Sequence, residues 1–406
     1  MQKHNMRTEK KSSIKNSATG LVLIALLVLI QTGWMVFLML KLNAYSTAIT
    51  LALTFIAVFI ALKIFGTHVN SAQRMPWLIV ITAVPFFGIC IYLLFGRSIV
   101  TKGMRRRFNG IESDILVNKL SQDETVIDEI AAKDKGIANQ CRYISHTARY
   151  PVYKNTDVEY YAEADISFAA QIEELKKAEH FIFMEYHAIE DALSFERLKK
   201  VLIEKAQSGV EVRIFYDDLG SIFFLNKEFI KRMREQGIQC RVFNPLKVVV
   251  NMFMNNRDHR KITVIDGRVG FTGGYNLADE YFNITHPYGY WKDTGIKLTG
   301  DAVRSLTASF LTMWNAIDHT DSQADYDKYL DAADNTYKAV DSECYVQPYS
   351  DNPLGQDRIG EDVYLNILKN AKDYVYITTP YLIITDEMER ELRLAVKRGV
   401  DVRIVT

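Results

Sequence analysis

The fold and the chemistry of this chain are decided by residues 257–276, which read Arg-Asp-His-Arg-Lys-Ile-Thr-Val-Ile-Asp-Gly-Arg-Val-Gly-Phe-Thr-Gly-Gly-Tyr-Asn. Two runs of β-branched and aromatic residues flank Asp266-Gly267, and this pattern predicts a tight β-hairpin. Successive side chains of a strand point to opposite faces, so we expect His259 and Lys261 on the same face. An imidazole can be neutral near pH 7 and so act as a nucleophile, and an ammonium stays charged and can neutralise phosphate oxygens; together they suit attack on a phosphate.

The polar residues of this stretch stand as His-x-Lys-x4-Asp, followed by Gly-Gly-x-Asn. A lone His and Lys on a strand are ordinarily just polar residues on a wet face. The whole arrangement, however, resembles the signature of the phospholipase D superfamily. This resemblance implies a catalytic group of His259, Lys261 and Asp266, with His259 as the nucleophile that takes a phosphatidyl group. It also implies that Lys261 and Asn276 hold the phosphate, while Gly274 lets the backbone approach the ligand. Asp266 lies in an Asp-Gly turn, which suits a structural role at least as well as a chemical one.

The amino-terminal region contains three uncharged runs, at residues 18–40, 42–62 and 75–96. Each is near the roughly 20 residues that a helix needs to cross a bilayer, so we expect residues 1–108 to form a membrane anchor with two to three spans. Pro85 and Gly88 would allow the third segment to be re-entrant or broken. The count of Lys and Arg on the two sides is seven against six, so it does not decide the orientation.

The run from Pro85 to Arg97 also resembles the end of the membrane region of bacterial cardiolipin synthases, whose catalytic part faces the cytosol. Arg105–Arg107 would then lie against anionic headgroups, or form an ordinary solvated charge run. The four cysteines show no metal-ligand spacing and no disulfide framework, which fits a cytosol-facing globular part.

Residues 109–140 are expected to form a helical, charge-rich connector, and the globular part is expected to begin near Cys141. Strands and helices then alternate, which predicts a largely parallel sheet covered by helices. The expected helices are 168–178, 195–207, 225–236 and 301–317, and the expected strands are 180–189, 210–216 and 238–243.

Several polar residues lie near the ends of these strands. Glu185, on an apolar strand, is either a buried functional carboxylate or a group on the wet face. Asp217-Asp218 ends a strand where α/β folds place ligand sites, but a simple turn is the favoured interpretation. The resemblance implies that Asp293, near the start of a strand at 295–298, supports His259 by fixing its ring. The aromatic residues Tyr288, Tyr290 and Trp291 are expected to pack against the sheet rather than form a lipid pocket.

Residues 372–404 repeat the pattern of residues 179–214, each with a strand, a helix and a Gly-Val-acid-Val-Arg-Ile strand. A repeated unit implies two similar lobes, so we expect a first lobe at 141–345 and the incomplete start of a second at 346–406. Phosphatidyl transfer needs one group to attack and another to protonate the leaving alkoxide. The superfamily supplies two histidines, one per motif, and this sequence contains one such motif. The interpretations are a fragment of a longer enzyme, which is favoured, a pair of chains that completes the site, or an inactive product.

The resemblance thus implies an α/β fold: a phospholipase D-like lobe with a mixed, largely parallel sheet flanked by helices, preceded by transmembrane helices and followed by a partial second lobe. The implied enzyme is a multi-pass bacterial membrane cardiolipin synthase that joins two phosphatidylglycerol molecules through a phosphohistidine and releases glycerol. No metal or other cofactor is implied, because Lys and His supply the positive charge. The expected partners are phosphatidylglycerol and other anionic lipids, with a homo-oligomer possible.

Three alternatives remain at this point. A membrane phospholipase D or phosphatidylserine-type synthase would use the same residues with another acceptor. A non-enzymatic binder of anionic lipids, or a partner of a complete enzyme, is favoured by the missing second motif. A nuclease is disfavoured by the membrane segments and by a net charge of zero.

Overall fold

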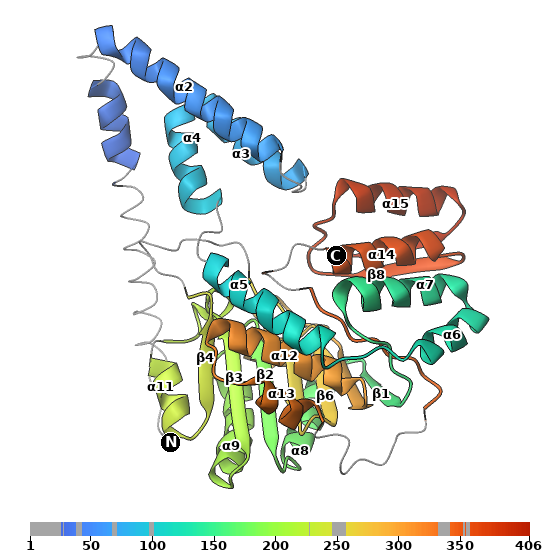
Figure 1. Cartoon of the computed structure of the whole chain (residues 1–406). Helices are drawn as coiled ribbons and strands as arrows, with labels where there is room; N and C mark the ends of the chain where they lie inside the picture. Colours follow the sequence, from blue (N-terminus) through green and yellow to red (C-terminus); the bar gives the residue numbers. More distant parts are fainter. Residues whose placement is uncertain are drawn as a thin grey trace.

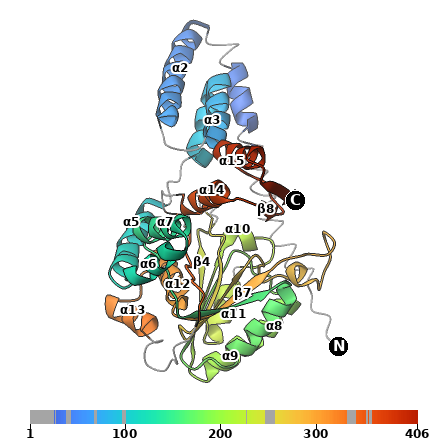
Figure 2. The ribbon, with the colours of Figure 1, turned by 90° about the vertical axis from the view of Figure 1, so that its right-hand side faces the viewer.

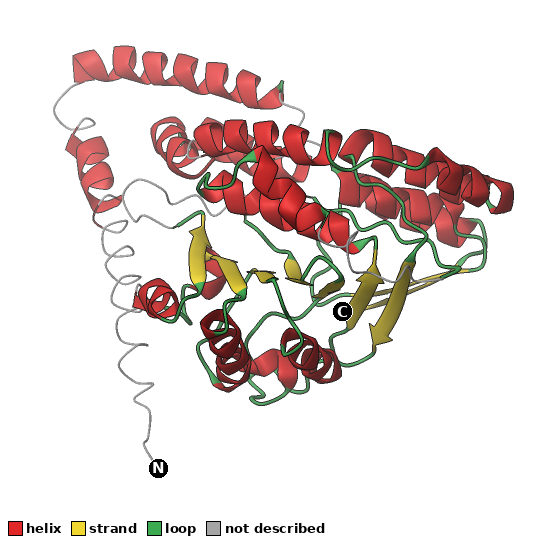
Figure 3. Ribbon diagram, turned by 60° about the horizontal axis from the view of Figure 1, so that its bottom comes forward, coloured by secondary structure: helices red, strands yellow, loops and turns green. Residues whose placement is uncertain are grey.

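A computed structural model describes residues 26, 28–37, 43–66, 71–96, 101–226, 228–245, 257–331, 342–351, 354 and 358–406. Its main body is a seven-stranded sheet with helices on both faces (Figures 1 and 3). The strands are β1 Thr156–Tyr161, β2 Phe181–Tyr186, β3 Glu211–Asp217, β4 Gln239–Phe243, β5 Lys261–Ile265, β6 Val269–Gly273 and β7 Gly295–Gly300.

The sheet is mixed, with the strand order β1-β7-β6-β5-β2-β3-β4. The neighbours β2, β3 and β4 are parallel, and every other neighbouring pair is antiparallel. The prediction of a largely parallel sheet is therefore wrong. Parallel neighbours require crossover connections, which occur here through α9 (Leu193–Gln207) and α11 (Glu228–Glu235), whereas the hairpin at β5–β6 and the return into β7 reverse the chain directly.

Both faces of the sheet are covered, which explains why every residue of β2 is buried. On one face, Phe181 and Phe183 join a core with the long apolar helix α12 (Val303–Ile317), where the rings of Phe183 and Phe310 stack with centroids 4.6 Å apart. On the other face, Ile182 and Met184 join a core with α8 (Ala164–Leu175), α9 and α11. A strand with two covered faces loses the alternation of apolar and polar residues, as the near-continuous apolar run of β2 shows.

The expected connector at 109–140 is helical, but it is also part of the core. It contains the end of α5 (Thr101–Glu112), the π-helical turn η2 (Ser113–Val117), α6 (Glu124–Lys133) and the start of α7 (Lys135–Tyr143), which continues into η3 (Ile144–Ala148). Phe108, Ile111 and Ile115 are buried in the same cluster as α12. The globular body therefore extends back to α5 rather than beginning near Cys141.

The amino-terminal helices are α2 (Asn43–Phe65), α3 (Ser71–Ala83) and α4 (Pro85–Ile91), followed by the π-helical turn η1 (Tyr92–Gly96). Within the described residues, one helix, Thr47–Phe65, is long and apolar enough to cross a membrane, while Val28–Phe37 and Arg74–Ala83 are shorter apolar helices. The expected segment 42–62 thus corresponds to α2. Much of the expected segment 18–40 lies outside the described residues.

The third expected segment, 75–96, does not form one continuous helix. The chain breaks at Val84, whose backbone angles are not helical (φ −136°, ψ 79°), and α4 begins with Pro85. A Cβ atom at Gly88 would lie 2.4 Å from the carbonyl oxygen of Val80, so α4 folds back closely on α3. The third segment is thus broken, as Pro85 and Gly88 in the sequence would allow, and the absence of a side chain at Gly88 also permits the close approach.

The carboxyl-terminal residues form a separate two-stranded parallel sheet, β8 (Tyr374–Thr378) with β9 (Asp401–Val405), together with α14 (Ile359–Asn370) and α15 (Asp386–Lys397). Figure 2 shows this unit beside the main sheet, on the side of the amino-terminal helices. Its small core contains Leu368, Val375 and Leu392. The parallel β8–β9 pair repeats the β2–β3 pair of the main sheet, as the internal repeat of the sequence predicts.

Candidate active site

The predicted hairpin is present, with Asp266 and Gly267 both at positive φ (52° and 66°) and a turn bond from Arg268 N to Ile265 O of 3.0 Å. The carboxylate of Asp266 accepts hydrogen bonds of 2.8 Å from the backbone amides of residues 179–181. Asp266 therefore fastens the hairpin to the start of β2. It follows the last residue of β5, whereas His259 precedes the first, so the structure does not bring Asp266 to the other site residues.

The register of the sheet brings a second histidine to His259. Tyr186 of β2 pairs with Lys261 of β5, so the residues just beyond these strand ends, His187 and His259, lie together. Their ring centroids are 4.7 Å apart with an interplanar angle of 55°. His187 donates from Nδ1 to the carbonyl oxygen of Asp258 at 2.6 Å. His187 is not predicted from the sequence, because a histidine at the end of a strand indicates a site only when the neighbouring strand and its register are known.

His259 is an exposed imidazole that stays neutral at physiological pH. Although the residue is exposed at the surface, the surrounding protein removes part of the water around its ring, and this desolvation is the main reason why the pKa of His259 is lowered to about 4. The charge of Lys261 and the imidazole of His187 lower it further. A neutral imidazole keeps a nitrogen lone pair available for attack.

Lys261 is the fixed cation of the site. It is the first residue of β5, is buried, and donates from Nζ to the carbonyl oxygen of His259 at 2.6 Å. Burial lowers the pKa of Lys261 to about 8, while the carboxylates of Asp258 and Asp293 act in the opposite direction. The ammonium is therefore still largely protonated at pH 7, two residues from the imidazole, as predicted.

Asn276 and Gly274 follow the hairpin. Asn276 is buried, accepts from the amide of Ala188 at 3.1 Å and donates to the hydroxyl of Tyr281 at 2.9 Å. Its amide is therefore oriented by the loop after β2, the loop that also carries His187. A Cβ atom at Gly274 would lie 2.1 Å from Oδ1 of Asp293, so the absence of a side chain here makes room for that carboxylate.

Asp293 lies two residues before β7, and its charge interacts with that of Lys261. It accepts from the amide of Thr294 at 2.8 Å and from the indole of Trp291 at 3.5 Å, and burial raises its pKa. Between these two described residues, Asp293 and His259, the structure shows no hydrogen bond. In this structure Asp293 interacts with the charge of the lysine, and its support of the His259 ring stays a prediction.

A buried ionic cluster lies behind the two histidines. Arg260 is 2.5 Å from Glu185 and 3.2 Å from Asp258, and both carboxylates are fully buried. Burial raises the pKa of Glu185 well above its ordinary value. Of the two interpretations of Glu185, the structure thus shows the buried carboxylate and not a group on the wet face.

Asp217 belongs to the same region and combines a turn role with a contact to the site. Its carboxylate caps α10 (Asp218–Ser221), accepts from the amide of Asp258 at 2.9 Å and pairs with Arg257 at 3.2 Å. Burial raises the pKa of Asp217 to about 6. The interpretation of Asp217 as a turn residue is confirmed. The same carboxylate also binds the backbone amide of Asp258, whose carbonyl oxygen accepts the hydrogen bond from His187.

The aromatic residues near Asp293 are more exposed than predicted. Tyr288 is 76% and Tyr290 68% exposed, so the expectation that they pack against the sheet is wrong for these two. Trp291 packs against Tyr281, with ring centroids 5.0 Å apart.

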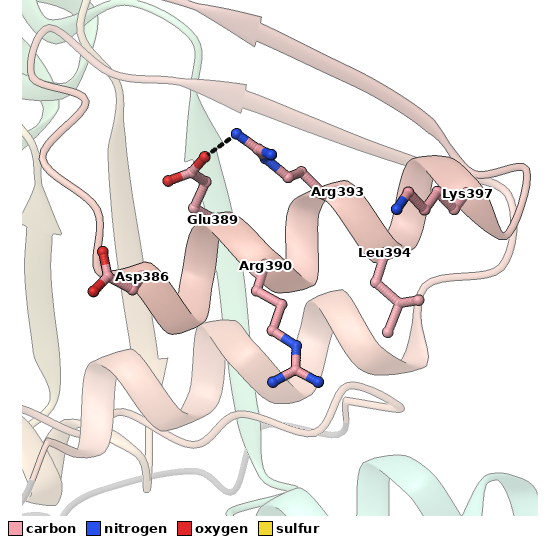
Figure 4. Close-up of a pocket in the computed structure, with 6 residues that line it drawn as sticks. All are labelled: Asp386, Glu389, Arg390, Arg393, Leu394 and Lys397. Atoms are coloured by element: carbon pink, nitrogen blue, oxygen red, sulfur yellow. Dashed lines mark hydrogen bonds and ion pairs between the residues drawn. The ribbon is translucent and has the colours of Figure 1, made fainter.

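Elsewhere, the outer face of α15 carries a hollow of about 410 Å³, lined by Asp386, Glu389, Arg390, Arg393, Leu394 and Lys397 (Figure 4). An ion pair joins two of these side chains, Glu389 and Arg393. The lining contains no histidine, cysteine or hydroxyl nucleophile, so it does not compete with the site at His259. Among the described residues no group of three or more His, Cys, Asp and Glu side chains is placed to hold a metal ion.

The chain is similar to proteins of a known family. Residues 171–314 match the family model described as a cardiolipin synthase, PLD-like domain, and residues 52–97 match a phospholipase D-nuclease N-terminal model. A cardiolipin synthase of Oceanobacillus iheyensis is 30% identical over 366 residues, covering 88% of this chain and 74% of that protein. An uncharacterised protein of Streptococcus mutans is 38% identical over 346 residues, covering 85% and 73%. The crystal structure of a phosphatidylserine synthase of Haemophilus influenzae matches with a TM-score of 0.43 and 14% identity, over 65% of each chain.

Proposed function

The chain belongs to the cardiolipin synthase family of the phospholipase D superfamily, and from this premise we propose that it is a phosphatidyltransferase that makes cardiolipin and glycerol from two phosphatidylglycerol molecules. The observation that carries the proposal is the pair at the start of β5. There a neutral, exposed imidazole and a buried ammonium stand two residues apart. A nucleophile without charge next to a fixed cation suits attack on an anionic phosphodiester.

The reaction proceeds in two displacements at phosphorus. A ring nitrogen of His259 attacks the phosphorus of one phosphatidylglycerol, so that a P–N bond forms and the P–O bond to glycerol breaks. The leaving alkoxide takes a proton from water and departs as glycerol, which leaves hydroxide. The free hydroxyl of a second phosphatidylglycerol then attacks the phosphohistidine and forms a new P–O bond, its proton passes to that hydroxide, and the P–N bond breaks to restore His259.

The other residues have supporting roles in this proposal. Lys261 neutralises the phosphate oxygens, and Asn276 donates to them from an amide that the loop after β2 orients. Asp293 supports the charged state of Lys261, and Gly274 makes room for Asp293. Asp266 is proposed to be structural, since its carboxylate is occupied by three backbone amides.

The membrane placement is also part of the proposal. We place α2 across the bilayer, with the flanking apolar segments in or against it and the catalytic body on the cytosolic face. α5 then follows the membrane region directly, and the exposed Arg106 and Arg107 lie where they contact anionic headgroups.

The proposal is tested with the protein in membranes that contain labelled phosphatidylglycerol, by measuring cardiolipin and released glycerol. His259→Ala is expected to lower the transfer rate on the order of 10⁴-fold, because the covalent step loses its nucleophile. His286→Ala, which changes an exposed histidine outside the site, is the matched control and should keep full activity.

Binding to phosphatidylglycerol vesicles is measured in parallel and should survive in His259→Ala. Vesicle binding by the unaltered protein without any transfer would instead support the alternative of a lipid-binding partner protein. Release of phosphatidic acid with water as acceptor would support a phospholipase D.

A further inference from the structure

The proposed reaction leaves one imidazole at the site without a role, that of His187. Three neighbours hold this ring. Its Nδ1 donates to the carbonyl oxygen of Asp258 at 2.6 Å, and its ring is tilted by 55° against that of His259, with the centroids 4.7 Å apart. A Cβ atom at Gly220 would lie 2.7 Å from its Nε2, so the backbone of α10 closes the third side. A side chain held in this way has little rotational freedom left.

The contact with Asp258 also fixes the tautomer of His187. A carbonyl oxygen only accepts, so Nδ1 carries the proton in the neutral ring and Nε2 does not. The carbonyl itself is held, because the amide of Asp258 donates to the buried carboxylate of Asp217 at 2.9 Å. Two successive hydrogen bonds thus link Asp217 to the Asp258 backbone and that backbone to His187, whose ring contacts the ring of His259.

The charged groups around the two rings favour the neutral forms of both. Lys261 on β5 and Arg257 in the segment before it bring positive charge, and Asp258 brings negative charge. A proton on either imidazole would add to the charge of the lysine within the same small space. Each ring therefore makes protonation of the other less favourable.

We propose that His187 is a positioning residue, which fixes the ring of His259 for attack on phosphorus and disfavours protonation of the nucleophile. This inference rests on the proposed function, since it gives His187 a part in the same phosphatidyl transfer. A nucleophile that is pre-oriented and carries no proton on its attacking nitrogen reaches the transition state with less reorganisation.

Two variants separate this role from simple packing. His187→Phe keeps an aromatic ring against His259 but removes the hydrogen bond to Asp258 and the titratable nitrogens. His187→Gln keeps an N–H donor for that carbonyl but removes the ring. His180→Phe, at the exposed amino end of the same strand, is the matched control.

The first readout needs no turnover. The rate at which diethyl pyrocarbonate modifies His259 is measured against pH, and chymotryptic cleavage after Phe215 and Phe243, which lie between the two histidines in the sequence, places them on separate peptides for mass spectrometry. In both His187 variants, the midpoint of His259 modification is expected to move to higher pH. The second readout is transfer activity, for which kcat should fall about 10–100-fold with KM unchanged. The control variant should match the unaltered protein in both.

Folded His187→Phe protein with an unchanged midpoint and unchanged kcat would overturn the inference. Loss of folding in both variants, judged by circular dichroism, would assign His187 to stability and overturn it as well. If the unaltered protein makes no cardiolipin, the proposed function fails, while the modification midpoints still report whether the two rings are coupled.

Discussion

At the scale of the residue, the environments of His259 and Lys261 set the pH range in which the site works. The pKa of His259 is lowered to about 4 and that of Lys261 to about 8. As pH rises through 4 the imidazole loses its proton and becomes a nucleophile, and as pH rises through 8 the ammonium loses the charge that holds phosphate. We therefore expect kcat/KM for phosphatidyl transfer to rise near pH 4, stay level, and fall above about pH 8.

The measurement is a pH–rate profile with detergent-dispersed phosphatidylglycerol. Lys261→Arg serves as the comparison, because a guanidinium does not lose its proton in this range and the alkaline fall should move to higher pH. An acid limb at the ordinary histidine value near 6.5 would contradict the expected environment of His259.

Asp266 belongs to the sequence motif, but its hydrogen bonds indicate that it stabilises the fold. Asp266→Asn keeps a residue type that tolerates positive φ but removes the charge that accepts three backbone N–H groups. We expect unfolding to become easier by about 2–4 kcal/mol, because hydrogen bonds to a charged acceptor are lost in a buried place. Urea denaturation measures this loss, and the activity per folded molecule should be nearly unchanged. A large fall in kcat without loss of stability would show that Asp266 takes part in the reaction.

At the scale of the element, the sequence predicted individual strands and helices better than their arrangement. The hairpin followed from Asp266-Gly267, β2 followed from an apolar run, and β3 and β4 followed from the strand-forming runs after Gly209 and Gly237, because these signals are local. The direction of the neighbours and the pairing of Tyr186 with Lys261 depend on contacts between distant segments, which no local pattern encodes. The contact of His187 with His259 and the buried ion pair of Glu185 with Arg260 could not be predicted for the same reason.

The internal repeat gives an element-scale prediction with its own control. Arg213 of β3 is 5% exposed, pairs with Asp321 at 2.6 Å and lies over the ring of Phe183, whereas its counterpart Arg403 of β9 is 69% exposed and lies over Tyr376. Arg213→Ala would leave the buried Asp321 without its cation, so we expect a loss of about 3–5 kcal/mol in the free energy of unfolding.

Arg403→Ala, in contrast, is expected to leave the urea midpoint unchanged, since an exposed ion pair contributes little. If Arg213→Ala and Arg403→Ala lowered the free energy of unfolding equally, the face of β8–β9 that carries Tyr376 would be covered in solution. It would then resemble the corresponding face of β2–β3, which α12 covers.

At the scale of the whole molecule, the question is on which side of the membrane the catalytic body lies. Helix α2 supplies the apolar length for a crossing, and the basic α5 begins shortly after the membrane region. The count of Lys and Arg on the two sides of the membrane segments is nearly equal and does not decide the orientation, so the proposed cytosolic placement of the body needs its own test.

Cys344 allows a direct test, since it is exposed on the catalytic body, whereas Cys141 and Cys240 are buried. A membrane-impermeant maleimide is expected to leave Cys344 unmodified in intact bacterial cells and to modify it once the cells are permeabilised, because the body then becomes reachable. Cys344→Ser should abolish the modification and so identifies its site. Modification of Cys344 in intact cells would place the body outside, and the headgroups against α5 would then belong to the outer leaflet.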